Sequence, residues 1–521
     1  MNDLSEQSGA PQAPFTQREY AVLLVSIFMA GFCGLVYELL IGASGSYLLG
    51  DSIKQFSLAI GLMMTAMGLG SWLSRLLTRQ LLSWFVGIEI LLGLVGGLSV
   101  PLLYAVYAMA DESAYYMAMV SVSMAIGIMI GLELPLLTRL FERNTRLKFN
   151  ISNVLSLDYL GALAATLLFP FVLLPWLGNF SSSLVVGLVN VAVGIVNILW
   201  LGGRVQPRFR VGLWVGASVT ALALILPALF SAELTTLWQN GLYRDRVIFS
   251  SQTRFQHIVM TRNRDDIRLY LDGHLQFSSR DEKRYHESLV HVPMMATPFH
   301  ERVLLLGAGD GLAVRELLKY KDIKQIVVVD IDPEMTRLAR ENPLIRGLNG
   351  GSLEDPRVEV VNGDAFGYLT GPGAPFEVIL ADLPDPSHGQ LARLYSVAFY
   401  KAARTRLSRH GILATQATSA YATPEAFWSI GKTLQVAGFR HITPYHAYVP
   451  SFGDWGFMLA GGKVLDHRSL KPKFPMTFLD SESIQGLFHF PADMGPRAVE
   501  ANTLNRPHLL RYYLHGWQHW N

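Results

Sequence analysis

The sequence predicts two parts of different fold class: an α-helical bundle that spans a membrane, then a doubly wound α/β domain with a small preceding β-sheet. Half of the 521 residues are apolar and 16% are charged, whereas about a quarter of the residues in a soluble domain are charged. The apolar residues are concentrated in 20–234, and residues 243–521 have an ordinary soluble composition. In this second part, short apolar runs alternate with helical patterns, which is typical of a parallel sheet.

The composition excludes several classes of partner and site. The net charge of +2 comes without a basic stripe or an aromatic platform, so no nucleic-acid partner is expected. The single cysteine, Cys33, excludes an internal disulfide and a cysteine-based zinc site. We expect no metal site. Residues 1–17 are polar and are predicted to form a disordered tail.

Seven apolar segments are long enough to cross a hydrocarbon core of about 30 Å as helices of about 20 residues. They lie near residues 20–44, 55–74, 82–109, 114–138, 154–177, 182–202 and 209–231. Because further segments follow the first one, it is predicted to stay as a span rather than to be a cleaved signal peptide. Residues 18–235 are thus a predicted multi-pass domain in the cell (inner) membrane, and the lipid bilayer is an expected partner.

Basic residues gather after the second, fourth and sixth of these segments. They are Arg75, Arg79, Arg139, Arg143, Arg146, Lys148, Arg204, Arg208 and Arg210. Since loops rich in Lys and Arg stay in the cytoplasm, this pattern places the N-terminus inside. Seven complete crossings would then place residues 243–521 outside.

Three acids, Glu38, Glu133 and Asp158, lie at or near membrane depth. An ionised carboxylate in lipid is costly, so each is expected to face the interior of the bundle. Two interpretations stay open with equal weight: the acids mark a functional site, or they make structural polar contacts with each other or with helix ends.

The second part is predicted to contain a small β-subdomain (243–300), a Rossmann-like domain (301–464) and a C-terminal extension (465–521). Residues 247–250, 256–261 and 267–271 are expected to form the small sheet. In the main domain, strands at 302–306, 324–330, 357–361, 376–381 and 411–416 alternate with helices at 312–320, 333–342, 395–408 and 424–437.

A glycine-rich turn, Gly307-Ala-Gly309-Asp310-Gly, follows the first strand of this domain, and a helix is expected to begin near Leu312. Such a turn lets the backbone approach a nucleoside closely, because glycine has no Cβ. A carboxylate there would repel a pyrophosphate. Asp310 therefore points to a nucleoside that carries a cation, such as an amine or a sulfonium.

Acids follow three further strands: Asp330, Asp364, and the pair Asp382 and Asp385. Each alone has an ordinary explanation, since aspartate is common in turns and helix caps. However, the carboxyl ends of parallel strands meet at one edge of the sheet, where ligands bind. The sequence therefore predicts an acidic cleft for a cationic ligand.

Several motifs occur in the order that is typical of the spermidine synthase (polyamine aminopropyltransferase) family, over about residues 243–462. They are Tyr270-Leu-Asp-Gly-His-Leu-Gln276, Asp281-Glu-Lys-Arg-Tyr285-His286-Glu287, the turn that contains Asp310, Asp382-Leu-Pro-Asp385-Pro, and Leu394-Tyr-Ser-Val-Ala-Phe-Tyr400. The chain resembles the bacterial branch of this family, in which a multi-span membrane region precedes the catalytic domain. An S-adenosylmethionine-type Rossmann-like fold is thus implied.

The resemblance implies transfer of the aminopropyl group of decarboxylated S-adenosylmethionine, as co-substrate, to an amine such as putrescine, giving spermidine and methylthioadenosine. No prosthetic group is expected. Asp382 matches the proton acceptor of the family, Asp385 its partner that holds the amine, and Asp310 the residue that holds the ammonium of the aminopropyl arm. Other matching positions are Tyr285, His286 and Gln276 toward the amine, and Gln256, Gly307, Gly309, Asp330, Asp364 and Ala365 toward the nucleoside.

The sequence departs from the family pattern in three places. Ala308 replaces a glycine of the turn, and Pro384 replaces a Ser or Thr before the second acid. The usual tyrosine of the amine wall falls on Pro450 in a gapless alignment, with Tyr448 as a candidate substitute and Asp454 as a further cation contact. Putrescine is the default acceptor, while agmatine, cadaverine and spermidine stay open.

Two other functions stay open: a membrane-tethered methyltransferase that uses intact S-adenosylmethionine, and a polyamine transporter or sensor whose second part only binds. Because decarboxylated S-adenosylmethionine is made in the cytosol, the catalytic domain is expected there. This conflicts with the basic loops unless one segment does not cross, an eighth crossing exists, or the charge rule fails. The C-terminal extension is expected to pack over the amine entrance or the membrane face, and a homodimer or homotetramer stays open.

Overall fold

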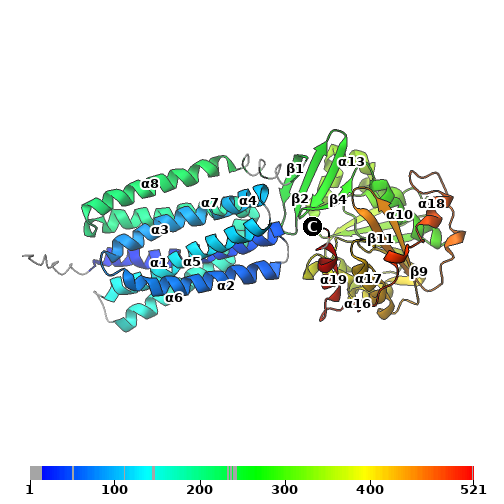
Figure 1. The fold of residues 1–521 in the computed structure, drawn as a ribbon. Coiled ribbons are helices and arrows are strands. Elements are labelled where there is room, and N and C mark those ends of the chain that lie inside the picture. The colour runs from blue at the N-terminus through cyan, green and yellow to red at the C-terminus, as the bar shows by residue number, and fades with distance from the viewer. Residues whose placement is uncertain are drawn as a thin grey trace, which may run out of the picture. The chain divides into compact units, whose positions relative to one another are not determined.

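The computed structural model describes residues 15–49, 52–110, 112–142, 147–231, 234, 238, 243, 245–518 and 520. The predicted tail therefore lies almost wholly outside the described residues. The chain divides into two compact units, Met1–Arg244 and Asp245–Asn521. Each unit has its own hydrophobic core, and no residue of one core belongs to the other. A helical bundle followed by an α/β unit with a small preceding sheet confirms the predicted fold class (Figure 1).

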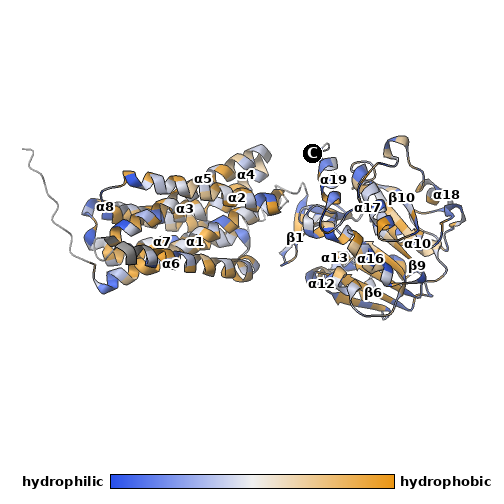
Figure 2. Ribbon diagram, turned by 90° about the horizontal axis from the view of Figure 1, so that it is seen from below, coloured by the Kyte–Doolittle hydropathy of each residue, from blue (hydrophilic) through white to orange (hydrophobic). Residues whose placement is uncertain are grey.

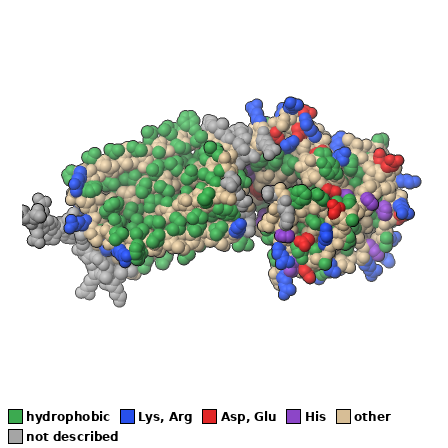
Figure 3. Space-filling model, viewed as in Figure 1, with side chains coloured by type: hydrophobic (Ala, Val, Ile, Leu, Met, Phe, Trp, Pro, Cys, Tyr) green, Lys and Arg blue, Asp and Glu red, His purple; other side chains and the backbone are tan. Residues whose placement is uncertain are grey.

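The first unit is a bundle of long apolar helices. Its α-helices are α1 (Gln17–Leu49), α2 (Ser52–Leu73), α3 (Leu81–Gly97), α4 (Ser99–Met109), α5 (Glu112–Glu142), α6 (Leu147–Leu168), α7 (Leu174–Leu201) and α8 (Pro207–Leu229). Figure 2 shows apolar residues along the whole length of these helices, and Figure 3 shows hydrophobic side chains over the outer face of the bundle. An apolar outer face suits contact with lipid, because water would penalise that much exposed apolar surface.

Six helical stretches in the described part of the chain are long and apolar enough to cross a membrane. The sequence predicted seven, and the difference comes from Ser152–Arg204, a stretch of 53 residues that holds two of the predicted segments. A straight helix of that length would measure about 80 Å. The stretch bends at Gly178, whose φ of 68° and ψ of 178° are not helical. Both of its halves, α6 and α7, pack against α1, so this stretch passes through the bundle twice.

The second unit begins with a four-stranded antiparallel sheet in the order β1-β2-β3-β4. Its strands are β1 (Arg246–Gln252), β2 (His257–Asn263), β3 (Asp266–Leu271) and β4 (His274–Ser278). The first three match the predicted strands to within a few residues, and β4 was not predicted. Helix α10 (Glu282–Ala296) follows β4 and leads into the larger sheet.

The larger sheet has seven strands in the order β10-β11-β9-β8-β5-β6-β7. Strands β5 (Arg302–Gly307), β6 (Gln325–Asp330), β7 (Val358–Asn362), β8 (Phe376–Asp382) and β9 (Leu407–Gln416) are parallel, whereas β10 (His441–Val449) and β11 (Gly453–Gly461) form an antiparallel hairpin at one edge. The chain order reverses between β5 and β8, and at such a point an open α/β sheet binds its ligands.

Alternate residues of each central strand face opposite cores. In β5, Val303 and Leu305 pack in the core that contains α10 and α11 (Leu312–Leu317), while Leu304 and Leu306 face the core that contains α16 (Val397–Thr405) and α17 (Pro424–Val436). Helices α12 (Pro333–Glu341), α13 (Pro343–Asn349) and α14 (Ala365–Thr370) connect the remaining strands. The two-sided burial explains why these strands are almost wholly apolar.

The C-terminal residues wrap around this sheet and end in a helix at the candidate site. They include α18 (Ser481–Gly486) and α19 (His508–Trp517). Helix α19 packs against α17, and Gly516 lies so close to Thr423 that a Cβ there would overlap its side chain. Tyr513 and Leu509 of α19 are buried in the core shared with α16 and α17.

Candidate active site

The sheet register places three of the predicted acids at adjacent strand ends. Asp382, the last residue of β8, pairs with Gly307, the last residue of β5. Asp330 ends β6, which pairs with the other side of β5. Asp310 follows in the turn between them. The charges of Asp310 and Asp382 are close enough to act on each other, so the structure brings together the two acids on which the prediction depended.

The glycine turn is held between the acids on its two sides. Gly307 has a φ of 85°, and a Cβ at this position would overlap the carbonyl of Asp382. The backbone N–H of Gly309 donates to Oδ2 of Asp330 at 3.0 Å. Ala308, which replaces a glycine of the family's turn, has a φ of 60°. The alanine therefore adopts the left-handed backbone conformation that glycine favours. Helix α11 begins at Leu312 as predicted, and its first N–H donates to Oδ1 of Asp310 at 2.8 Å.

Asp382 accepts a hydrogen bond from the phenol of Tyr285 at 2.5 Å. Burial raises the pKa of Asp382 to about 6, against the opposing influence of the His286 charge, while the nearby Asp310 adds to the rise. A carboxylate with such a pKa is ionised at neutral pH and can still accept a proton readily.

Asp385 lies between two further side chains. Its Oδ1 accepts from Nε2 of Gln416 at 3.2 Å, and its Oδ2 accepts from the phenol of Tyr513 at 3.0 Å. Burial raises the pKa of Asp385 to about 6, although both hydrogen bonds lower it. Sequence reasoning missed Gln416 and Tyr513, because neither lies in a recognisable motif and Tyr513 is 128 residues away along the chain.

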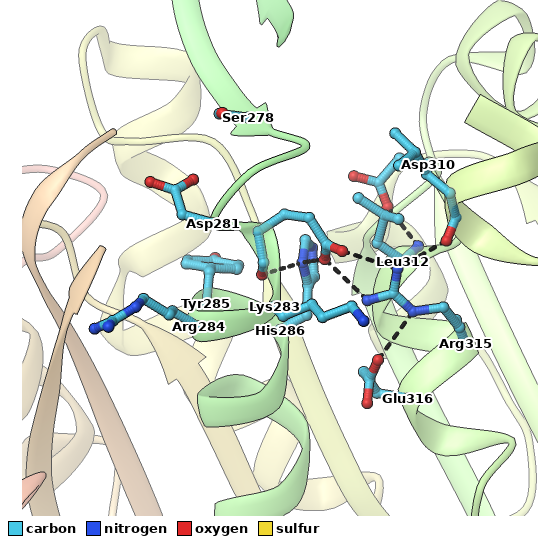
Figure 4. A network of polar contacts seen from close by, with 12 residues as sticks. Ser278, Asp281, Lys283, Arg284, Tyr285, His286, Asp310, Leu312, Arg315 and Glu316 are labelled. Atoms are coloured by element: carbon cyan, nitrogen blue, oxygen red, sulfur yellow. Dashed lines mark hydrogen bonds and ion pairs between the residues drawn. The ribbon is translucent and has the colours of Figure 1, made fainter. Parts of the chain in front are cut away.

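His286 belongs to a chain of ionic contacts that extends from α10 to α11 (Figure 4). Its Nδ1 donates to Oε2 of Glu282 at 2.9 Å, and Glu282 accepts two hydrogen bonds from Arg315, each 2.9 Å long. Burial lowers the pKa of His286, but Glu282, Asp310 and Asp382 together raise it to about 9. His286 is therefore a cation at neutral pH and lies among the acids of the site.

The residues that the sequence assigned to the nucleoside have less uniform contacts. Oδ1 of Asp330 accepts from the N–H of Asp332 at 2.9 Å, and burial raises the pKa of Asp330 to about 6. Nε2 of Gln256 donates to Oδ2 of Asp332 at 3.1 Å, so Gln256 lies beside this corner.

Two of the sequence-predicted residues, Asp364 and Gln276, have contacts that need no ligand to explain them. Asp364 caps α14 by accepting from the N–H of Gly367 at 3.1 Å, and it forms an ion pair with Arg393 at 2.9 Å. Ala365, the first residue of α14, is buried. Gln276 donates to the carbonyl of His274 in its own strand. No contact in the described part of the chain joins Gln276 to the acids.

The residues predicted to line the amine have other contacts in the structure. Tyr448 is 60% exposed, and Asp454 is paired with Nδ1 of His446 at 2.8 Å. The ring of Phe452 lies 6.0 Å from that of Tyr285 and 5.3 Å from that of Trp455. Phe452 was not among the predicted residues, and its ring lies near Tyr285, the hydrogen-bond partner of Asp382.

Comparisons with known proteins agree with this geometry. Residues 282–468 match the spermine/spermidine synthase domain. Over 498 residues the chain is 41% identical to a polyamine aminopropyltransferase of Leptospira interrogans, with 95% of this chain and 98% of the relative covered. The chain belongs to the polyamine aminopropyltransferase family. The aminopropyltransferase is also 41% identical to polyamine aminopropyltransferase 2 of Ralstonia nicotianae, over 96% of this chain and 99% of that relative.

A crystal structure of spermidine synthase in complex with the transition-state analogue AdoDATO is 26% identical to the aminopropyltransferase. It covers 47% of this chain and 85% of that chain, with a TM-score of 0.45. Residues 282–468, which match the spermine/spermidine synthase domain, include Asp310, Asp382 and Asp385. Tyr513 lies beyond the end of this range.

Proposed function

We propose that Asp382 is the general base of aminopropyl transfer in this enzyme, with putrescine as the default acceptor and decarboxylated S-adenosylmethionine as the donor. Membership of the family makes the chain an aminopropyltransferase. The observation that carries the proposed role is the position of Asp382: it is half-buried close to Asp310, its phenol partner is Tyr285, and loss of water raises its pKa to about 6.

The reaction needs a neutral amine, because a protonated amine has no lone pair with which to attack. The amine nitrogen forms a bond to the carbon next to the sulfonium, and the carbon–sulfur bond breaks. The electron pair of that bond goes to sulfur, which leaves as neutral methylthioadenosine. The proton that the amine loses is accepted by Asp382. Alignment of the two substrates in the cleft supplies several kcal/mol of the barrier, by an order-of-magnitude estimate.

The other acids are proposed to hold the cationic groups of both substrates. Asp310 holds the ammonium of the aminopropyl arm, and Asp385 holds the acceptor amine, with Tyr285, His286 and Gln276 toward the same ligand. This division is supported by the half-buried position of Asp310 and Asp385, where loss of water raises the pKa of each carboxyl group, so a cationic partner would favour the ionised form. The positive charge of His286 lowers the pKa of Asp310 and Asp382 and so favours their ionised forms.

The nucleoside is proposed to lie against the glycine turn. Gly307 and Gly309 give it room, Asp330 accepts hydrogen bonds from its ribose, and Gln256 lies on the same side. Asp364 and the N–H of Ala365 meet the adenine edge. Asp364 must then exchange its contact with Arg393 for the ligand. That exchange costs little, because the ion pair is about 40% exposed and surface pairs contribute roughly 0–1 kcal/mol.

The decisive experiment replaces Asp382 by asparagine. Turnover in Asp382→Asn is expected to fall at least about 100-fold, since general-base catalysis contributes roughly that much or more. Binding of decarboxylated S-adenosylmethionine, measured by calorimetry, is expected to persist. Asp355→Asn is the matched control, because Asp355 pairs with Arg357 away from the cleft. Methylthioadenosine release at the wild-type rate in Asp382→Asn would remove Asp382 as the base.

The same assay separates the alternatives. A mass of the product that exceeds the acceptor by one aminopropyl group identifies transfer from the decarboxylated donor. Addition of a methyl group from intact S-adenosylmethionine would identify a methyltransferase. Binding of polyamine without any product would identify a sensor.

We also propose that the bundle crosses the cell (inner) membrane and that the catalytic unit faces the cytoplasm, where the donor is made. Five passes separate the loop after α2 from the catalytic unit: α3 together with α4, then α5, α6, α7 and α8. Because five is an odd number, a cytoplasmic catalytic unit places the loop after α2 on the other side of the membrane. The proposal thus sets aside the orientation that the basic loops suggest. The second of these loops includes Arg143 and Arg146, which lie outside the described residues.

Variants with one introduced cysteine test this sidedness, since the native Cys33 is buried and the wild type serves as the blank for labelling. An impermeant maleimide is expected to label Arg79→Cys in intact cells and to label Lys463→Cys only after the membrane is opened. Labelling of Lys463→Cys in intact cells would place the catalytic unit outside.

A further inference from the structure

The interior of the helical bundle contains two acids whose buried oxygens have no partner among the residues that the structure describes. Glu89 of α3 is 0% exposed and Glu133 of α5 is 2% exposed. Both carboxylate oxygens of Glu89, and Oε1 of Glu133, are without a hydrogen bond. The two acids interact electrostatically with each other. An unpaired carboxylate at membrane depth costs several kcal/mol as an order of magnitude, so such a pair requires an explanation.

Neutral polar groups without partners also lie on two other helices of the described bundle. The hydroxyl of Tyr37 on α1 and both amide atoms of Asn190 on α7 are fully buried and also lack partners in the described part of the bundle. Tyr37 interacts electrostatically with both Glu89 and Glu133.

Helix α3 explains why these groups converge. Glu89, Gly93 and Gly96 are spaced by four and three residues, so they share one face of the helix. A Cβ at Gly96 would overlap the ring of Tyr37, and a Cβ at Gly93 would lie 3.3 Å from the Cβ of Asn190. The two glycines therefore let α1 and α7 bring their polar side chains against the face that carries Glu89. On α5, Ile130 contacts Gly34 of α1, and Glu133 lies one turn further along.

Two basic side chains of the bundle make contacts away from Glu89 and Glu133. Arg139 donates to the carbonyls of Ser74 and Leu77 at a helix end, and Arg204 is paired with Glu19. They do not neutralise the two acids. No contact identified in the described part of the bundle brings a positive charge to Glu89 or Glu133, so we consider a cation from outside the described residues, or uptake of protons by the acids.

We propose that Glu89, Glu133, Tyr37 and Asn190 form a second amine-binding site, inside the bundle, for the primary ammonium group of a di- or polyamine. A primary ammonium has three N–H donors, and this cluster offers several oxygen acceptors from four helices. A proton would satisfy one acceptor only. A metal ion is the weaker candidate, because no group of three or more His, Cys, Asp or Glu side chains in the described residues is arranged to hold one. The inference rests on the proposed function in one respect, namely that the enzyme acts on such amines.

Amine binding must be measured with the catalytic site disabled. The full-length double variant Asp382→Asn/Asp385→Asn, purified in detergent, is expected to bind about one labelled putrescine per chain. Adding Glu89→Gln is expected to weaken that binding at least about tenfold, and Glu133→Gln should do the same. Glu38→Gln is the matched control, because Glu38 is an acid of the same bundle without an electrostatic contact to the cluster. Its binding should not change.

Two further readouts protect the test against misfolding. Glu89→Gln in the otherwise unchanged enzyme is expected to elute from a sizing column in detergent and to melt as the wild type does, which shows a folded bundle, and to release methylthioadenosine at the wild-type rate. Dicyclohexylcarbodiimide, which reacts with carboxyl groups in apolar surroundings, is expected to modify Glu89 or Glu133, and putrescine should protect them while sodium chloride at equal concentration should not.

The proposal is overturned if the catalytic double variant binds no amine, or if Glu89→Gln and Glu133→Gln leave its binding unchanged. Equal protection by sodium would assign the cluster to an inorganic cation instead. These outcomes are separate from failure of the proposed catalytic role, which would show only in the turnover of Asp382→Asn.

Discussion

At the residue scale, burial separates acids that are otherwise alike. Asp364 is partly exposed and serves as a helix cap with an arginine partner. Asp382 and Asp385 lie beneath the sheet edge, where loss of water raises the pKa of each to about 6. The ordinary and the functional explanation of an aspartate are therefore not exclusive: Asp310 caps α11 with one oxygen and lies beside the cations of the site.

His286 provides a pH-dependent contribution to stability. Its pKa is raised from 6.5 to about 9 in the folded protein, so the contribution is complete below pH 6.5 and disappears as pH rises through 9. The shift corresponds to about 3 kcal/mol at about 1.4 kcal/mol for each pH unit. Burial raises the pKa of Asp330, Asp382 and Asp385 to about 6, which lies below this window.

We expect His286→Gln to lower the free energy of unfolding relative to the wild type. The loss should be smaller at pH 9.5 than at pH 6.5. Denaturant titrations of both proteins at several pH values measure the difference. A constant difference across the window would mean that His286 is neutral in the folded protein.

At the element scale, the last helix contributes a side chain to the candidate active site. Helix α19 lies outside the matched family domain, yet its Tyr513 donates to the acid proposed to hold the amine. The phenol is buried, with 5% of its surface exposed, and Gln416 of β9 approaches the other oxygen of Asp385. Of the two expected positions for the C-terminal extension, this contact favours the amine entrance.

Tyr513→Phe is expected to raise the KM for the acceptor amine about tenfold, because a hydrogen bond to a charged group contributes about 1.5–3 kcal/mol. The KM for decarboxylated S-adenosylmethionine should change little, which a general loss of folding would not produce. Tyr512→Phe is the control, since Tyr512 is bonded to the backbone of Glu500 and not to the acids. Unchanged amine KM in Tyr513→Phe would make the contact purely structural.

At the scale of the whole molecule, the two units are built on separate cores. The membrane core draws only on residues before 239, and the two cores of the catalytic unit draw only on residues after 248. Every residue to which a role in the transfer reaction is proposed lies in the second unit. The bundle thus contributes no described side chain to the chemistry, and its own polar cluster is a different site.

Residues 245–521 expressed alone are therefore expected to fold and to transfer aminopropyl groups with kcat/KM within a few-fold of the full-length enzyme. Steady-state assays of both proteins, with melting curves, test this. A soluble, folded fragment without activity would show that the bundle takes part in catalysis.

The sequence by itself determined the two-part fold, the apolar spans, the glycine turn and the acids of the cleft, because periodicity and strand-end position are local properties of a chain. It also identified Tyr285 and His286 through their motif. Only the tertiary structure decided which groups meet across long stretches of sequence: Tyr513 with Asp385, Arg315 with Glu282, and the ring of Phe452 with that of Tyr285. It likewise brought in Glu89, which sequence reasoning overlooked, because burial depends on how helices distant in sequence pack together.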